Sequence, residues 1–171
     1  MADEVILGSG KLYLLEYTGT IPTDELLEVV GNSVGRIKGG AALEYKPTEY
    51  EVVDDNGEVV KRFITKEEVT FKSGVLTWNL DNLAKLSTGT LTTATGLKTL
   101  KIGSASKSLT SHVLRFVHTK DDGKELRITM IATAGNGFVL SFAGDKETVI
   151  DAMFKAINQA DGTLVEIKEE V

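Results

Sequence analysis

The chain has 171 residues and a formal net charge of −6 at pH 7, with 42% hydrophobic and 26% charged residues. This length suits one buried core, and this composition is that of a globular protein and not of a disordered one. The acidic balance disfavours nucleic-acid binding, which draws its affinity from Lys and Arg. The absence of cysteine excludes disulfides, thiol nucleophiles and thiolate metal ligands.

The N-terminal stretch MADEV is acidic, where a secretory signal would be basic and then apolar. No apolar run is long enough to cross a bilayer, so we expect no membrane association. A first strand is expected over Lys11–Thr18. The preceding Gly8–Lys11 is similar to a phosphate loop, but Val5 occupies the upstream Gly position and Leu12 follows the lysine, so we interpret it as a flexible lead into the strand.

Two short β-branched runs, Thr48–Val53 and Glu58–Thr65, flank the acidic turn Asp54–Gly57. Asn and Gly tolerate positive φ, so this pattern predicts a β-hairpin, and we expect an extended hairpin arm over about residues 46–66. An isolated hairpin is barely stable in water, so we expect the arm to be mobile in a free subunit and ordered by a neighbour. The contact candidates on the arm are Tyr50, Val52, Val60, Phe63 and Ile64.

The strand after the arm changes its pattern of alternation. Apolar residues fall on odd positions at Val69 and Phe71 but on even positions across Leu76–Leu80. Side chains of a strand alternate with a period of two, so the slip near Gly74 predicts a bulge or bend that turns the strand from one sheet into another. Trp78 is expected in the core.

Residues 87–111 include 12 Ser or Thr and three Gly but no acid, which predicts a long surface loop with a role in subunit contact. The acid-free region extends from Asn82 to Lys120 and carries six Lys or Arg, whereas the remainder has 13 Lys or Arg against 25 Asp or Glu, or −12. This division is either accidental or gives the subunit one basic and one acidic face for head-to-tail association. The contact candidates here are Lys98, Lys101 and Lys107.

A second hairpin is expected where His112–Thr119 and Glu125–Thr133 flank the turn Asp121–Gly123, followed by an alternating strand over Phe138–Phe142. The segment Thr148–Ile157 fits a helical face and a strand face equally well. The count reaches about eight strands. We therefore predict one mainly β domain over residues 1–171, folded as a β-sandwich or a partly closed β-barrel.

The chain offers no recognisable set of catalytic or ligand-binding residues. His112 and His118 lie on one face of a strand, but six residues separate them by roughly 20 Å, too far to share a metal or a proton. The acidic turn at Asp54 has the wrong spacing for a calcium loop, because Thr65 stands where the bidentate Glu is required. We expect no enzyme, no cofactor and no metal site.

Several phrases of the sequence resemble segments of one known family. Glu67–Leu80 is similar to its central strand, Asp81–Ser87 to the short helix that follows, and Gly135–Ile157 with Asp161–Val165 to its closing strands. From Ala41 to Leu86, strand-like alternation surrounds one acidic turn and leads into a short helical phrase. In this order the chain resembles the tail tube proteins of tailed bacteriophages, which favours a strand in the ambiguous C-terminal segment and a short helix flanking the sheets.

The resemblance implies a structural virion protein that forms stacked, hexameric rings and so a hollow tail tube. Phage DNA would pass through this tube to the host as transiting cargo and not as a specific ligand. The resemblance also implies contacts with further copies of the chain, a tape measure protein, tail-tip or baseplate proteins, a tail terminator and a sheath. The implied location is the virion tail, after assembly in the host cytoplasm.

Two alternatives stay open. Tail-like bacteriocins and contractile secretion systems use related tubes with a different cargo, and the residues do not separate these from a phage tail. The other alternative is a monomeric β-sandwich that binds a small ligand or carbohydrate, for which aromatics would cluster on an exposed face. An aromatic content of 6% and the apolar alternation around Trp78 disfavour such a module.

Overall fold

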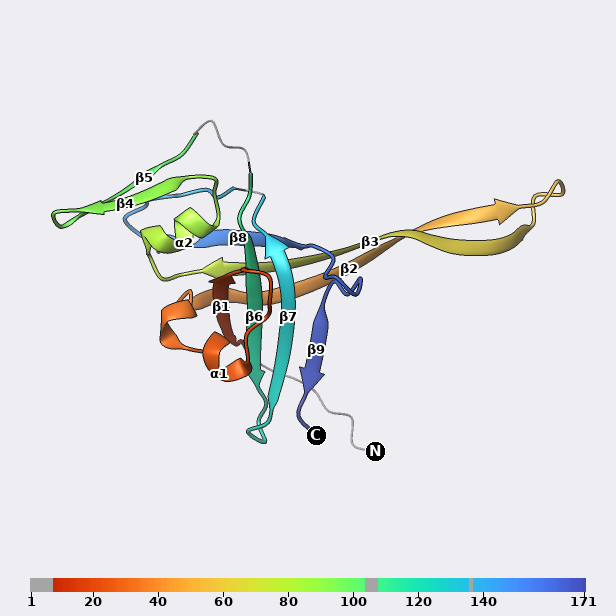
Figure 1. The fold of residues 1–171 in the computed structure, drawn as a ribbon, viewed down its shortest axis with the longest axis horizontal. Coiled ribbons are helices and arrows are strands. Elements are labelled where there is room, and N and C mark those ends of the chain that lie inside the picture. Colours follow the sequence, from red (N-terminus) through yellow and green to blue (C-terminus); the bar gives the residue numbers. More distant parts are fainter. Residues whose placement is uncertain (1–7, 104–107, 136) are drawn as a thin grey trace.

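The computed structural model describes residues 8–103, 108–135 and 137–171 (Figure 1). Strands account for 52% and helices for 8%, which confirms the mainly β class expected from the sequence. The strands are β1 (Lys11–Glu16), β2 (Ile37–Val53), β3 (Val59–Val75), β4 (Thr90–Ala94), β5 (Leu97–Lys101), β6 (Ser111–Thr119), β7 (Glu125–Thr133), β8 (Ile150–Ala156) and β9 (Glu166–Glu169). The helices are α1 (Asp24–Leu27), the 3-10 turn η1 (Val30–Asn32) and α2 (Leu80–Lys85).

The main sheet is antiparallel, with the strand order β1-β6-β7-β8-β3-β2 and with β9 beside β7. Strand β7 changes partner along its length, because Leu126–Thr129 pairs with β9 whereas Ala132 and Thr133 pair with β8. In Figure 1, β1, β6, β7 and β9 accordingly run across the direction of β8, β3 and β2. The two groups of strands form crossed layers that do not close into a barrel.

The hydrophobic core lies between these two layers. Leu114 and Phe116 of β6, Met130 of β7, Phe71 of β3 and Phe154 of β8 are all buried in it. The rings of Phe71 and Phe116 lie 5.5 Å apart between centroids and join strands of the two layers. Complete burial of such a side chain stabilises the fold by about 1.5–3 kcal/mol, so this body has its own source of stability.

The second face of β6 is covered by the segment that carries α1. Arg115 points to this side with a side chain only 2% exposed, and its Nη1 donates to Asp24 at 2.7 Å and to Glu28 at 2.6 Å. The hydrogen bond from Arg115 lowers the pKa of the Asp24 carboxyl. A guanidinium removed from water requires such partners, because its desolvation is costly. Strand β6 is therefore buried on both faces.

Both predicted hairpin turns are present, one between β2 and β3 and the other between β6 and β7. Gly57 and Gly123, which end them, each adopt a φ of 86°. The short helix expected after the central strand is α2, whose N-cap Asn79 accepts from the backbone N–H of Asp81 at 3.0 Å. The ambiguous C-terminal segment is strand β8, as the resemblance favoured.

The prediction that the strand bends near Gly74 and continues into another sheet is wrong. Strand β3 ends at Val75, and the irregularity lies in its partner β2, where the register shifts between Lys38 and Ala41. The even-numbered apolar residues after Val75 are therefore not a second strand face. Trp78, expected in the core, is 51% exposed.

Two further expectations are wrong. Residues 138–142, all within the described part of the chain, form no strand, although Phe138 and Leu140 pack against the core. The surface loop expected over 87–111 contains the hairpin of β4 and β5. In its turn Thr95 has a φ of 45° and Gly96 a φ of 76°. The β-branched residues on both sides of this pair are typical of a hairpin, but the Ser/Thr-rich composition concealed the pattern.

The close approach of β2 to β3 at the bulge is testable. A Cβ at position 74 would lie 2.3 Å from the backbone oxygen of Lys38, so Gly74→Ala should lower the free energy of unfolding by about 1–3 kcal/mol in urea denaturation. Gly31→Ala is the matched control, because nothing lies within 4 Å of its Cβ, and it should change stability by about 0.5 kcal/mol or less. Equal stability of the two variants would contradict this packing.

Candidate subunit-contact surface

The most prominent feature of the surface is the arm, the part of the β2–β3 hairpin that projects beyond the body (Figure 1). Each of these strands has 17 residues, but β3 pairs with β8 only over Thr70–Val75. Every residue from 44 to 68 is exposed. The arm expected from the sequence is thus present, and it begins even closer to the body than predicted.

One face of the arm carries an aromatic pair. Tyr50 and Phe63 are directly opposite each other in the register and are 61% and 45% exposed. Val52 lies opposite Lys61 on the same face, and the Lys61 ammonium is 4.6 Å from the centroid of the Phe63 ring. Cross-strand pairs of this kind contribute roughly 0.2–1 kcal/mol each, which keeps the ribbon paired but leaves its apolar surface in water.

The opposite face of the arm combines an ion pair with aliphatic side chains. Arg62 Nε donates to Glu51 Oε1 at 2.8 Å, and Val60 and Ile64 are exposed on either side of Arg62 along β3. The five arm candidates predicted from the sequence are therefore brought together, but they are divided between two faces of a thin ribbon. All five side chains stay exposed, and Ile64, which lies nearest the body, lines a hollow together with Asn158 and Leu164.

The turn at the tip of the arm is acidic and well ordered by its own hydrogen bonds. Asp54 Oδ1 accepts from the backbone N–H groups of Asn56 at 2.9 Å and Glu58 at 2.8 Å. The segment Glu49–Arg62 contains five acids and two bases, so the outer arm carries −3. Strand β2 also forms the edge of the sheet and leaves one side of its backbone without a strand partner among the described residues.

The predicted lysine contacts lie elsewhere and differ from one another. Lys98 of β5 pairs with Asp81 of α2 at 2.6 Å, a hydrogen bond that lowers the pKa of the Asp81 carboxyl. Lys101 is exposed and forms no ion pair within the described residues, and Lys107 lies outside them. In Figure 1 the β4–β5 hairpin projects from the end of the body opposite to the arm, so Lys98 and Lys101 lie far from the arm candidates of the same chain.

The continuous basic face that the charge count suggested is not formed. Arg115 is buried against Asp24 and Glu28, and Lys120 pairs with Glu169 of β9. Acids from distant parts of the chain thus neutralise several cations of the acid-free region. What remains basic is local and includes the β4–β5 hairpin.

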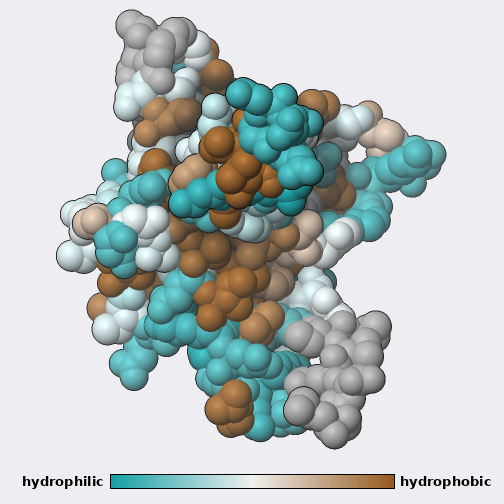
Figure 2. Space-filling model, turned by 90° about the vertical axis from the view of Figure 1, so that its right-hand side faces the viewer, coloured by the Kyte–Doolittle hydropathy of each residue, from teal (hydrophilic) through white to brown (hydrophobic). Residues whose placement is uncertain are grey.

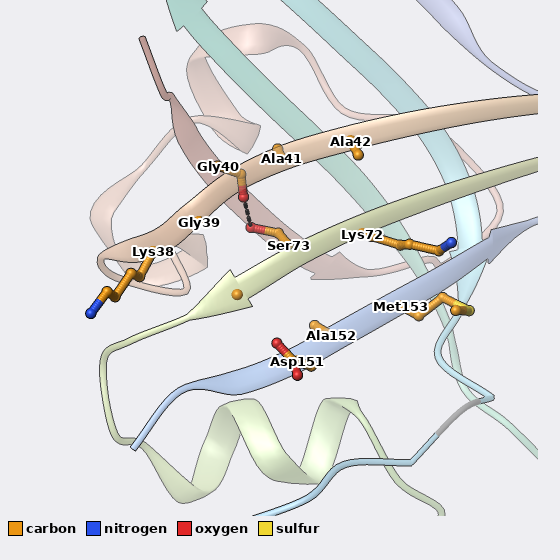
Figure 3. A pocket seen from close by; sticks show the side chains of 11 residues that line it. Lys38, Gly39, Gly40, Ala41, Ala42, Lys72, Ser73, Asp151, Ala152 and Met153 are labelled. Atoms are coloured by element: carbon orange, nitrogen blue, oxygen red, sulfur yellow. Dashed lines mark hydrogen bonds between the residues drawn. The ribbon is translucent and has the colours of Figure 1, made fainter. Parts of the chain in front are cut away.

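A shallow hollow of about 360 Å³ lies on the outer face of β2, β3 and β8 (Figure 3). Gly39, Gly40 and Ala42 leave it open, while Ser73 Oγ donates to the backbone oxygen of Gly40 at 3.2 Å. Lys72 at its margin pairs with Glu44 at 3.2 Å. The described residues that line the hollow include no aromatic side chain and no convergent reactive groups. We therefore interpret the hollow as space left by the missing side chains of the glycine-rich bulge, and not as a ligand site.

The residue that sequence reasoning placed worst is Trp78. It forms a tilted ring pair with Phe142 at 6.0 Å between centroids, and Phe142 is itself 75% exposed. The arm's side of the molecule, seen in Figure 2, likewise shows apolar residues in the middle of the face, bordered by hydrophilic ones. Exposed apolar surface therefore occurs both on the arm and away from it.

Among the described residues, no group of three or more His, Cys, Asp or Glu side chains is placed to hold a metal ion. None of the helices in the described part of the chain is long and apolar enough to cross a membrane. No protein-family model matches the chain, and no curated protein matches it.

The ion pair between β5 and α2 yields a test of how the β4–β5 hairpin is held. Lys98→Glu would set two carboxylates against each other and remove a surface pair worth about 0.2–1 kcal/mol. We expect faster amide hydrogen exchange across Thr90–Lys101, with the melting temperature of the body unchanged. Lys101→Glu is the matched control and should leave this exchange as in the wild type. Slow exchange in both variants would show that the pair does not hold the hairpin.

Proposed function

We propose that this protein is a structural subunit that polymerises through its arm into a hollow tube, as the tail tube proteins of tailed bacteriophages do. The observation that carries the proposal is the arm itself, a long hairpin whose apolar side chains stay exposed to water on both faces. Monomeric proteins seldom maintain such a surface, because it invites association. The open edge of β2 adds a second means of association.

The magnitudes favour assembly through many arms at once. Complete burial of an aliphatic or aromatic side chain is worth about 1.5–3 kcal/mol, and the arm side chains are already partly covered by one another. Association of two proteins costs about 4–15 kcal/mol. One arm therefore holds two subunits weakly, whereas a closed ring adds its contacts together. Assembly should be cooperative and depend steeply on concentration.

By the resemblance, the rings are hexameric and stack into a conduit for phage DNA in the virion tail, after assembly in the host cytoplasm. The partners are further copies of the chain, a tape measure protein, tail-tip or baseplate proteins, a tail terminator and a sheath. The net charge of −6 supports this role, because a conduit with an acidic subunit repels phosphates and does not retain its cargo. A tail-like bacteriocin or a contractile secretion system would use the same assembly with another cargo.

A second candidate function is the binding of a small ligand or carbohydrate by the monomer. The observation that favours it is the exposed pair of Trp78 and Phe142, the kind of aromatic surface on which such modules stack their ligands. The two candidates differ in a simple measurement, because a binding module stays monomeric at millimolar concentration and a tube subunit does not.

Shortening the arm tests the proposal directly. Residues 50–63, which include Tyr50 and Phe63, are replaced by Asn-Gly, so that the cross-strand partners Glu49 and Ile64 flank a two-residue turn. The variant should remain monomeric in light scattering at concentrations where the wild type polymerises. Its melting temperature should stay close to that of the wild type, because the removed residues do not contact the core.

The matched control for this experiment is Val30→Ser, which removes an even more exposed apolar side chain from η1 and should polymerise normally. Polymers of the arm-shortened variant at the wild-type concentration would refute the role of the arm.

A further inference from the structure

The backbone around Trp78 is anchored by hydrogen bonds, and yet Trp78 and its partner Phe142 are both more than half exposed. Trp78 lies three residues after the end of β3 and directly before the N-cap of α2. The backbone N–H of Arg36 donates to Thr77 Oγ1 at 2.7 Å, and the N–H of Leu76 donates to the Arg36 oxygen at 2.8 Å. The backbone is thus anchored on both sides of the tryptophan, at Thr77 by Arg36 and at Asn79 by the start of α2. This lowers the conformational entropy that binding of a partner would remove.

The exposed residues around Trp78 resemble those found at the centre of protein–protein interfaces. Trp78 and Phe142, which form the tilted ring pair, are both more than half exposed. We define these two residues as the aromatic end surface. Trp and other aromatics dominate the energetics of protein interfaces, whereas on a free surface they expose large apolar areas to water.

The aromatic end surface and the arm lie at opposite ends of one strand. In Figure 1 the end of β3 and the start of α2 lie at the far side of the body from the arm tip. A strand of 17 residues spans roughly 55 Å. A contact between two different surfaces at opposite ends of a subunit is heterologous. Its repetition generates a ring where the rotation between neighbours closes and an open row where it does not, so one contact of this type can join many copies.

The charges at the two ends are complementary. The outer arm, Glu49–Arg62, carries −3. The β4–β5 hairpin contains no acid, and of its two lysines Lys98 is neutralised by Asp81, whereas Lys101 forms no ion pair within the described residues. Arg36, whose backbone N–H is hydrogen-bonded to Thr77 next to Trp78, is exposed and forms no ion pair within the described residues. Complementary charge steers association and fixes its orientation.

We infer that the arm of a second copy of this chain docks on the aromatic end surface, with its Tyr50–Phe63 face against Trp78 and Phe142 and its acidic tip toward Arg36 and Lys101. The inference rests on the proposed function and names the partner surface that the arm requires. It differs from the ligand-binding alternative, which would place a small molecule on the same aromatic pair.

Trp78 is the only tryptophan in the chain, so tryptophan fluorescence reports on this surface alone. Docking removes the indole from water, and we expect the emission maximum of the wild type to shift to shorter wavelength as polymers form. The arm-shortened variant should keep the emission of the monomer at every concentration. Polymers with unchanged emission, or a blue shift of the arm-shortened monomer on addition of oligosaccharides, would overturn the inference.

Cross-linking gives a second readout that does not depend on removing the arm. The chain has no cysteine, so single replacements by Cys form unambiguous disulfides. Under assembly conditions with a mild oxidant, Val52→Cys should cross-link to a differently tagged Ser141→Cys, exposed next to Phe142, at least tenfold faster than to Val30→Cys, the matched control on η1. If polymers form but the two cross-linking rates are equal, the proposed contact between the arm and the aromatic end surface is wrong. Failure of the wild type to polymerise would instead contradict the proposed function.

Discussion

The structure depends on one strand that belongs to two environments. The last residues of β3, Thr70–Val75, pair with β8 and carry Phe71 into the core, whereas its first ten residues pair only with β2 and stay exposed. A two-stranded ribbon cannot bury its own apolar side chains. The body must therefore hold the base of the ribbon firmly. The exposed apolar side chains of the arm can release free energy only when a partner buries them.

The body meets this demand by burying its central strand on both faces. Between the layers, β6 contributes Leu114 and Phe116 to the apolar core, and behind them Arg115 binds the α1 segment through two carboxylates. Both sets of contacts are independent of the arm. A protein with this design can fold as a monomer and still expose apolar surface to a partner, and the self-assembly that we propose requires this combination.

Features that depend on neighbouring residues, such as turns and short helices, could be predicted from the sequence. The Asn56–Gly57 turn and its β-branched flanks predicted the arm and its five contact candidates, and Asp81–Ser87 predicted α2. What it could not provide were non-local relations. An alternating pattern does not mark where a strand ends, so Trp78 was placed in the core, and nothing near Lys98 in sequence foretells its pairing with Asp81. The Thr95–Gly96 turn was readable but hidden in a Ser/Thr-rich stretch.

The central claim is that the exposed arm exists to join copies of this chain. Negative-stain electron microscopy of the purified protein, concentrated without any partner, tests it most directly. Our account predicts rings and hollow tubes of constant diameter whose number rises steeply with concentration. A field of single particles of monomer size at the highest concentration reached, after long incubation, would contradict it.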